Sequence, residues 1–393
     1  MFSEIHLPKG FKCAGISAGI KPTGVKDMAL ILSDEPACAA GVFTTNQVCA
    51  APVKVCREHL KYGVARAIVM NSGIANACTG AEGIVAAKDM AAEAARLIGC
   101  APQEIFVCST GKIGPQLPLD KIEAGIAKLF DAALIENVQE TAEAMMTTDT
   151  RPKVSVAEIE IEGRPVKIVG FAKGAGMIEP NMATMLSYIT TDAAVERSAL
   201  QSALKRAVDQ SFNRISIDGD QSTNDTVLAL ANGAAETRPL NEASHDWCVF
   251  EQALGQVCFE LAMMIVHDGE GADKFVTVRV AGAASAEDAE WAARAVANSM
   301  LNKTAWAGTY PDWGRIMDAI GYSKAKVVEE KVDIFYDDTQ AVAGGCRSGV
   351  AQEDLIKVVS QTDFAININL RIGEGEAVVY TCNCTEEYVR INY

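Results

Sequence analysis

The sequence predicts a mixed α/β protein, because segments with strand patterns and segments with helix patterns alternate along the chain. Residues 64–73 form an apolar run that ends in a turn, as a buried strand does. Residues 89–99 space their apolar side chains as a helix does and end in a glycine. The strand pattern returns at 105–111, and an amphipathic helix pattern follows at 119–130.

The second half of the chain continues this alternation. Residues 154–174 alternate apolar and polar side chains on both sides of Glu162-Gly163, which predicts a β-hairpin. Residues 285–300 begin with a serine, a residue type that caps helices, and continue with helix formers. Further strands are predicted at 185–190, 214–220 and 274–282, and further helices at 196–212, 245–266 and 353–360.

The composition is that of a folded protein with an acidic surface. Hydrophobic residues make up 49% of the 393 residues and charged residues 22%, which excludes a disordered chain. The formal net charge of −16 repels phosphate backbones, and the densest basic stretch, 205–214, holds three cations and an aspartate. We therefore expect no nucleic-acid partner.

The N-terminus and the cysteines predict a cytoplasmic protein. Glu4 and His6 stand where a signal peptide carries basic residues. No run approaches the roughly 18 apolar residues of a membrane span, and the most apolar segment, 257–266, carries Glu260, so we expect a buried helix and no membrane partner. The 12 cysteines and four histidines lack metal-ligand spacing, which predicts reduced thiols and no metal site.

Two motifs resemble known functional patterns but fit ordinary turns better. GISAG (15–19) matches the GxSxG pattern of serine hydrolases, but a proline and a glycine follow where a helix must begin after the nucleophile Ser17. DGDQSTND (218–225) begins like a calcium loop, but Thr223 and Ala229 occupy the positions that require glycine and glutamate. A polar turn after a strand is the preferred interpretation.

Glycine-rich stretches mark candidate ligand contacts. KGAG (173–176) and DGEGADK (268–274) allow close approach of backbone to a ligand without completing a phosphate-binding motif. Thr110 and Gly111 follow a predicted strand, and two neighbouring donors at a strand end suit an oxyanion hole. On spacing alone, each stretch could equally be an ordinary turn.

A threonine after a chain break suggests a different nucleophile. Thr184 follows Ala183 and enters a predicted strand, as a self-cleaving N-terminal nucleophile does. Its hydroxyl would attack the preceding carbonyl, an N-to-O shift would make an ester, and hydrolysis would free the threonine amine. A free α-amine has a pKa of roughly 7.7–8 and can act as general base for its own hydroxyl. From composition alone, a threonine that merely starts a strand stays the alternative.

Ten blocks in order along nearly the whole chain carry a resemblance. They are AGVFTTNQVCAAPV (40–53), NSGIANACTG (71–80), CSTGKIG (108–114), MTTDTRPK (146–153), AKGAGMIEPNMATML (172–186), SFNRISIDGDQSTNDT (211–226), HDGEGADK (267–274), NKTAWAG (302–308), PDWGRI (311–316) and EYVRIN (387–392). Together they resemble the ornithine acetyltransferase family, the bifunctional glutamate N-acetyltransferases of arginine biosynthesis.

The resemblance implies a fold and a processing event. The fold would be the N-terminal-nucleophile-like αββα sandwich of the aminopeptidase and ornithine acetyltransferase superfamily, with smaller C-terminal α/β lobes. The implied domains are a catalytic core at 1–240, a connecting lobe at 241–280 and a C-terminal lobe at 281–393. The precursor would cut itself between Ala183 and Thr184 into an α chain and a β chain that stay together, typically as α2β2.

The resemblance also assigns residue roles and substrates. Thr184 matches the nucleophile, and Thr110 and Gly111 match the oxyanion hole. The positions that match substrate contacts are Thr147, Lys173, Thr184, Glu270 and Asn392. Acetyl would pass from N2-acetyl-L-ornithine to L-glutamate through an acetyl-Thr184 ester, without a cofactor, and acetyl-CoA is a possible second substrate.

Two other functions stay open. One is a self-processed amidase or aminopeptidase of the same superfamily, in which water takes the acyl group; the other is a non-catalytic metabolite-binding protein. The chain also departs from the family, with Tyr310 and Asn383 where aspartate is usual and an end at Tyr393, a few residues early. We expect the early end to raise KM modestly and to leave the chemistry intact.

Overall fold

The computed structural model describes residues 5–22, 24–133, 136–179 and 185–393, which form two compact units. Unit 1 comprises Met1–Gly174, Pro180–Asn213 and Gln221–Ile265. Unit 2 comprises Ala175–Glu179, Arg214–Asp220 and Val266–Tyr393. Two short segments from the first 220 residues therefore belong to the C-terminal unit.

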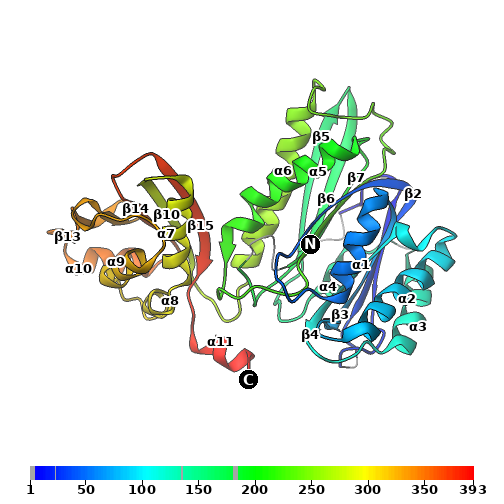
Figure 1. Cartoon of the computed structure of the whole chain (residues 1–393), viewed down its shortest axis with the longest axis horizontal. Coiled ribbons are helices and arrows are strands. Elements are labelled where there is room, and N and C mark those ends of the chain that lie inside the picture. Colours follow the sequence, from blue (N-terminus) through cyan, green and yellow to red (C-terminus); the bar gives the residue numbers. More distant parts are fainter. Residues whose placement is uncertain (1–4, 23, 134–135, 180–184) are drawn as a thin grey trace. The chain divides into compact units, whose positions relative to one another are not determined.

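Unit 1 is built on an eight-stranded mixed sheet of described strands (Figure 1). Its strands are β1 (Phe11–Ile16), β2 (Met28–Phe43), β3 (Val64–Ile74), β4 (Ile105–Lys112), β5 (Lys153–Ile161), β6 (Arg164–Lys173), β7 (Leu186–Thr191) and β9 (Thr226–Ala231). Their order is β4-β3-β2-β9-β7-β6-β5, with β1 paired to β2. The pairs β3–β4 and β7–β9 are parallel and the others are antiparallel.

The predicted hairpin at 154–174 is confirmed, and its turn explains the register. Strands β5 and β6 pair antiparallel from Ile161 opposite Arg164 to Lys153 opposite Ala172. The two turn residues, Glu162 and Gly163, both have positive φ, at 52° and 73°. Two left-handed residues make the tight turn whose twist matches that of the flanking strands.

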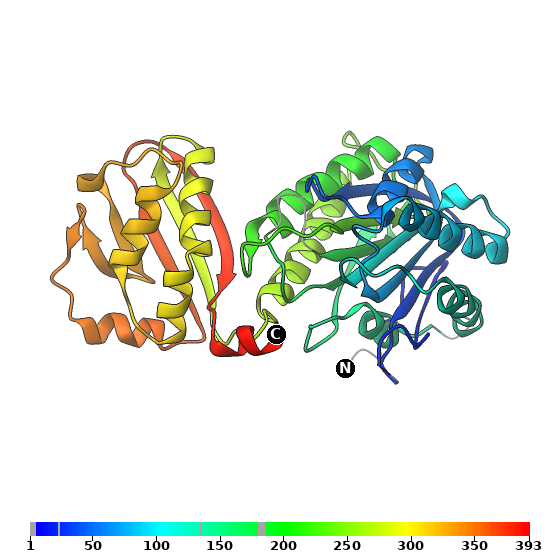
Figure 2. The same ribbon diagram turned by 60° about the horizontal axis from the view of Figure 1, so that its bottom comes forward.

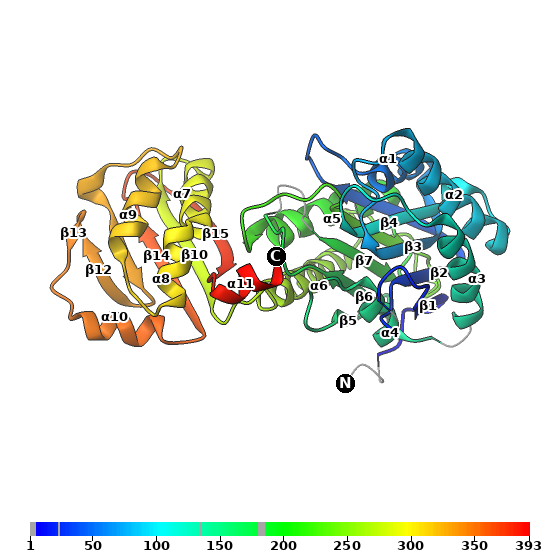
Figure 3. The same cartoon turned by 90° about the horizontal axis from the view of Figure 1, so that it is seen from below.

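Six helices of the described residues accompany this sheet. They are α1 (Ala51–His59), α2 (Gly80–Ile98), α3 (Leu119–Ala132), α4 (Val138–Met145), α5 (Arg197–Gln210) and α6 (Trp247–Val266). Helices α2 and α3 contact each other, and α3 and α4 both contact β1 (Figures 1 and 3). Short 3₁₀ helices lie at Leu60–Tyr62, Pro102–Glu104, Phe212–Arg214 and Glu329–Lys331.

Helix α6 is long and apolar enough to cross a membrane by length and composition alone. Half of its most apolar window is buried inside the structure. A Cβ on Gly170 of β6 would lie 2.6 Å from Val257 Cγ1 and 2.7 Å from Leu261 Cδ1, so the helix packs directly on the sheet. Glu260 accepts a hydrogen bond from Ser155 Oγ of β5 at 2.6 Å. Packing on the core therefore accounts for the apolar face of this helix.

Unit 2 is built on a seven-stranded sheet of described strands. They are β8 (Ile215–Ser216), β10 (Phe275–Ala283), β11 (Asp333–Tyr336), β12 (Thr339–Ala343), β13 (Cys346–Arg347), β14 (Asp363–Asn369) and β15 (Gly375–Cys382), in the order β13-β12-β11-β14-β10-β15-β8. Its helices are α7 (Ala286–Asn298), α8 (Met300–Ala307), α9 (Trp313–Tyr322), α10 (Gln352–Val359) and α11 (Glu386–Ile391). Helix α7 lies on β10 and β15, and its neighbours α8 and α9 pack against it (Figures 2 and 3).

Most predicted elements are found where the sequence places them. The mixed α/β class with two sheets is confirmed, as is the Ser285 cap, whose side chain accepts the N–H of Asp288. Helix α2 begins at Gly80 rather than at 89, and α11 was not predicted. The predicted strand at 214–220 shortens to Ile215–Ser216. The 12 cysteines are free thiols, five of them buried.

The two sheets draw on different parts of the chain. The strands of the second sheet, apart from β8, all lie beyond residue 274. The small-residue stretch at 281–288 falls between β10 and α7, inside unit 2. The chain passes from unit 1 to unit 2 at Ile265–Val266, the end of α6, because that helix packs on the first sheet.

Candidate active site

Parallel pairing of β3 and β4 brings two glycines into contact at the strand ends. Ser72 lies opposite Thr110, and Gly73 lies opposite Gly111. Gly111 has a φ of 124°, and a Cβ there would lie 2.3 Å from the backbone carbon of Gly73. Glycine is therefore required at 111, both for its conformation and for the close approach of the two strands.

The lysine at the end of β6 reaches this place. Lys173 Nζ donates to Thr110 Oγ1 at 3.4 Å, and Lys173 is 8% exposed. Lys173 is also paired with Leu186, the first residue of β7, two residues after Thr184. The sheet thus places a hydroxyl, an ammonium group and the first residue of β7 close together.

A buried carboxylate organises the neighbouring backbone. Asp149 Oδ1 accepts from Lys153 Nζ at 2.7 Å and from the N–H of Gly174 at 2.6 Å. Its Oδ2 accepts the N–H of Thr147 at 2.9 Å. Burial alone would raise the pKa of Asp149, but the positive charges of Lys173 and Lys153 outweigh it and hold the pKa well below its ordinary value.

A second lysine lies beside the same strand ends. Lys21 Nζ donates to the carbonyls of Met146 and Lys26. A Cβ on Gly73 would lie 3.2 Å from Lys21 Cγ, so the lysine stem runs along the end of β3. Burial lowers the pKa of Lys21 to about 8, against the raising effect of Asp27 and together with the lowering effect of Lys173.

Two buried asparagines fix the positions of the strand ends. Asn71 Oδ1 accepts from Ser109 Oγ at 2.6 Å, which ties β3 to β4. Asn224 Nδ2 donates to the carbonyls of Ala75 at 2.6 Å and Ser109 at 2.8 Å. The residue that precedes Thr110 is therefore held by two side-chain amides.

The other two predicted substrate residues lie in unit 2 and contact each other. Asn392 Nδ2 donates to Glu270 Oε2 at 2.6 Å and to the carbonyl of Tyr388 at 2.9 Å. Glu270 is 8% exposed, and its N–H donates to the carbonyl of Ala175 at 2.9 Å. A Cβ on Gly176 would lie 2.4 Å from the Glu270 carboxyl carbon, so glycine makes room for this side chain.

The predicted site residues therefore fall into two groups. In unit 1, Thr110, Gly111 and Lys173 are together, and Thr147 is linked to them through Asp149. In unit 2, Glu270 and Asn392 are together. Ala183 and Thr184 lie outside the described residues. No sequence pattern singled out Asp149, Lys21, Asn71 or Asn224. The i, i+4 spacing of Asp149 and Lys153 was the one local signal for any of them.

The weaker motifs have structural roles. Ser17 is exposed and follows β1 without a helix behind it, so no nucleophile elbow forms. The two carboxylate oxygens of Asp218 accept hydrogen bonds from the backbone N–H groups of residues 177 and 178.

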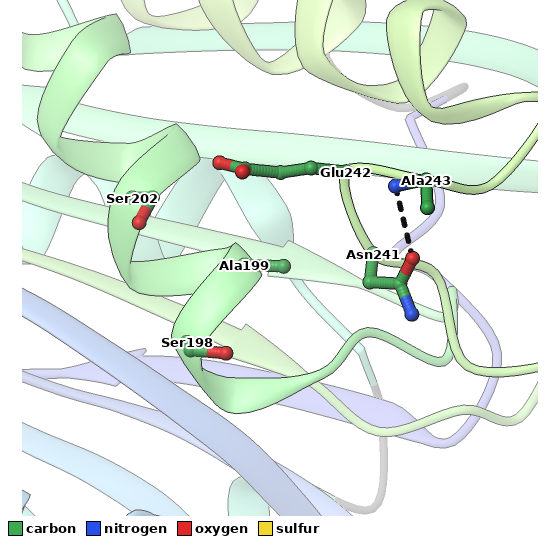
Figure 4. Close-up of a pocket in the computed structure, with 6 residues that line it drawn as sticks. All are labelled: Ser198, Ala199, Ser202, Asn241, Glu242 and Ala243. Carbon is green, nitrogen blue, oxygen red and sulfur yellow. Dashed lines mark hydrogen bonds between the residues drawn. The ribbon is translucent and has the colours of Figure 1, made fainter.

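A surface pocket of about 250 Å³ lies beside α5 and is lined by Ser198, Ala199, Ser202, Asn241, Glu242 and Ala243 (Figure 4). None of its lining residues belongs to the candidate site.

Fold and site together define a class, an α/β protein whose strand ends suit acyl transfer, because a hydroxyl, a glycine backbone and the buried ammonium group of Lys173 meet there. The ArgJ family model matches residues 12–393, and the chain belongs to the ArgJ family.

Curated relatives and a solved structure agree with this assignment. The chain is 46% identical over 385 residues to the "Arginine biosynthesis bifunctional protein ArgJ" of Geobacter sulfurreducens, covering 98% of each chain. It is 44% identical to the protein of that name from Dehalococcoides mccartyi, covering 99% of this chain and 96% of the relative. The crystal structure of the Bacillus halodurans protein is 41% identical, with a TM-score of 0.51, over 53% of this chain and 99% of that chain.

Proposed function

We propose that this protein is a self-cleaving acetyltransferase of arginine biosynthesis that moves acetyl from N2-acetyl-L-ornithine to L-glutamate. The names of the curated relatives supply the pathway. The main support for the chemistry is the contact of Lys173 with Thr110 at the strand ends. Lys173 is also paired with Leu186, which follows the proposed nucleophile by two residues.

Thr184 is the proposed nucleophile. Its hydroxyl oxygen attacks the acetyl carbonyl carbon while its free α-amine takes the proton. The Thr110 hydroxyl and the Gly111 N–H bind the resulting oxyanion. The carbon–nitrogen bond then breaks, the amine returns the proton to the leaving ornithine, and glutamate attacks the acetyl-Thr184 ester by the reverse sequence. An ester on threonine needs no cofactor, so acetyl-CoA enters only as an alternative acetyl donor.

The charges of the site residues suggest which substrate group each residue binds. Both substrates carry a carboxylate, and the Lys173 ammonium group contacts Thr110. The N–H of Thr147 binds Asp149, which lies beside the same strand end. Glu270 is proposed to bind an amine of ornithine, and Asn392 holds the Glu270 carboxylate through its amide. Charge-assisted hydrogen bonds of this kind are about twice as strong as neutral ones.

The sheet order supports a processed precursor whose products stay together. A cut before Thr184 would assign β7 and β9 to one product and β2 and β6 to the other, yet β9 pairs with β2 and β7 pairs with β6. The Bacillus halodurans chain is matched over 99% of its length by 53% of this chain, about the fraction that follows residue 183. We propose an α2β2 assembly in the cytoplasm.

A two-part assay tests the proposal. Purified protein is given N-acetylornithine and glutamate, and N-acetylglutamate and ornithine are measured; acetyl-CoA and glutamate are then given to a second sample. Formation of N-acetylglutamate in the first sample supports the transferase. Release of acetate and ornithine without acetylated glutamate would make the protein an amidase instead.

A further inference from the structure

Unit 2 contains a surface pocket of about 240 Å³ that is lined by none of the candidate site residues. Its lining residues come from the loop before α9, from β12, from the end of β13 and from the start of α10 (Figure 3). The polar ones are Tyr310, Asp312, Trp313, Arg347 and Gln352. A cavity of roughly 150 Å³ is large enough to hold benzene. This pocket therefore has room for one ring and a small polar group.

Arg347 brings an unpaired positive charge to the pocket. Its side chain is exposed, and within the described residues it makes no ion pair and no hydrogen bond. Acidic residues outnumber basic ones in this chain, 51 to 35, so the chain has carboxylates in excess and still offers none to Arg347. A guanidinium group can bind a carboxylate through two parallel hydrogen bonds. Arg347 is therefore available to a carboxylate from outside the chain.

The acidic side chain of the pocket is already paired. Asp312 Oδ2 lies 2.9 Å from Arg315 Nε, and its Oδ1 accepts the N–H of Arg315 at the start of α9. At the start of α10, Asp354 pairs with Lys357 at 2.7 Å, and neither Asp354 nor Glu353 lines the pocket. The lining residues thus carry one uncompensated charge, and it is positive.

Two aromatic side chains line the same pocket. Tyr310 is 50% exposed, and Trp313 packs partly buried against the core of unit 2. Neither side chain makes a hydrogen bond within the described part of the chain. Thr309, directly before Tyr310, has a φ of 53°, which is an outlier for a β-branched residue. Such strain persists only where the surrounding structure imposes it, and it occurs most often at binding sites.

A buried hydroxyl within the electrostatic reach of Asp312 also lacks a partner. Tyr336 of β11 is fully buried, and among the described residues its Oη has no hydrogen-bond partner. Burial raises the pKa of Tyr336, and the negative charge of Asp312 raises it further. Buried polar groups are nearly always paired in folded proteins. Arg347 is therefore not alone among the polar groups around the pocket in having unused hydrogen-bonding capacity.

We propose that this pocket binds a small carboxylate that carries one flat ring. Arg347 pairs with the carboxylate, and Tyr310 and Trp313 contact the ring, since aromatic side chains stack on flat apolar groups. One cation balances one negative charge, which favours a carboxylate over a phosphate group with its charge of about −1.5 to −2. The inference does not depend on the proposed acetyl transfer, because no residue of the candidate active site lines the pocket.

Isothermal titration calorimetry of the full chain tests the inference. The probes are phenylacetate, its uncharged analogue phenylacetamide, and phenyl phosphate. We expect phenylacetate to bind the wild type at millimolar concentration, roughly tenfold or more tightly than phenylacetamide, as a hydrogen bond to a charged group implies. Absence of phenylacetate binding, or equal affinities for phenylacetate and phenylacetamide, would overturn the proposal. Tighter binding of phenyl phosphate would overturn the choice of a carboxylate.

Two arginine variants locate the bound charge. Arg347→Gln should weaken phenylacetate binding by roughly tenfold or more and leave phenylacetamide binding unchanged. Arg279→Gln is the matched control, because Arg279 is an exposed arginine of β10 that does not line the pocket, and it should bind phenylacetate as the wild type does. Tyr310→Ala should weaken the binding of both probes, because both lose the contact with its ring.

Lys173→Met distinguishes this pocket from the candidate active site, where Lys173 could also attract a carboxylate. Binding that is lost in Lys173→Met and retained in Arg347→Gln would place the probe at the active site and overturn the inference. Melting temperatures of the wild type and Arg347→Gln are compared, and equal values with weakened binding support a ligand contact. A melting temperature of Arg347→Gln below the assay temperature would assign Arg347 to the stability of the fold and overturn its role in binding.

Discussion

Lys173 Nζ lies 3.4 Å from Thr110 Oγ1, so a buried ammonium group points at the hydroxyl that is proposed to bind the oxyanion. The ammonium can donate only to the oxygen lone pairs, which leaves the hydroxyl proton free to point elsewhere. Polarisation by the neighbouring positive charge makes that proton a stronger donor. The Lys173 ammonium group and the Thr110 hydroxyl are therefore proposed to bind the oxyanion together.

Removal of the Thr110 hydroxyl tests its proposed role in oxyanion binding. Thr110→Ala should lower kcat by on the order of 10²-fold with little change in KM, because the contact forms mainly in the transition state. Thr110→Ser keeps the hydroxyl and is the matched control, expected to retain most of the activity. Steady-state kinetics with N-acetylornithine and glutamate measure both constants, and a raised KM with an intact kcat would instead assign Thr110 to ground-state binding.

Self-cleavage has a direct chemical signature. Wild-type protein should give two bands on a denaturing gel, and N-terminal sequencing of the second should read TMLSYI. Thr184→Ala, which lacks the hydroxyl, should remain intact at 41.7 kDa and transfer no acetyl group. Intact wild-type protein with full transferase activity would contradict the role of a free threonine amine as base.

The Asp149–Lys153 pair predicts a large effect on stability. Both side chains are at most 1% exposed, and removing one partner of a buried ion pair costs about 3–5 kcal/mol. Asp149→Asn should therefore lower the free energy of unfolding, measured by urea denaturation, by roughly that amount. The double variant Asp149→Asn, Lys153→Met should recover part of the loss, because it no longer buries the Lys153 charge without the opposite charge of Asp149. If the double variant were less stable than Asp149→Asn, the pair would not explain the loss.

The same carboxylate predicts how stability depends on acid pH. Its pKa is lowered in the folded state, so the folded protein binds fewer protons than the unfolded chain, in which an aspartate titrates at about 3.9. The stabilisation is complete above that unfolded value and is lost as the pH falls below it. Between pH 5 and pH 3 the wild type should lose more unfolding free energy than Asp149→Asn, and parallel curves would contradict this assignment.

Lys21 predicts a slope of the same sign at alkaline pH. Its pKa of about 8 in the folded protein lies below the value of about 10.4 in an unfolded chain. Between these values the unfolded chain holds the extra proton, so stability should rise with pH. Lys21→Met should remove this rise in melting temperature between pH 8 and 10. Lys12→Met, at an exposed lysine of β1, is the control and should retain it.

The sequence predicted the parts of the fold that depend on neighbouring residues. The β5–β6 hairpin follows from Glu162-Gly163, since two residues with positive φ specify a tight turn. The extents of α3 and α5 follow from apolar spacing. The assignment of 175–179 and 214–220 to unit 2 could not be predicted, because it depends on hydrogen bonds such as that between Asp218 and Met177, 41 residues apart.

The same distinction applies to the site. Thr110 and Gly111 could be singled out because small donors at a strand end are a local pattern. The close contact of Gly111 with Gly73 required the parallel pairing of β3 and β4. Asn224 could not be found from its own segment, because its amide binds the carbonyls of Ala75 and Ser109 in two other parts of the chain.

The strand order of the first sheet bears on the proposed cut, because β9 and β7 lie between β2 and β6. If the two halves were translated from separate genes, the β7–β9 ladder would carry two open edges, and β2 and β6 would each lack a neighbour. Unpaired edges of this kind bind other chains and aggregate. A single continuous precursor avoids that hazard, because every strand finds its partner before the backbone is divided. If the chain is cut before Thr184 as proposed, folding should therefore precede the cut, and the two products should separate only when the first sheet unfolds.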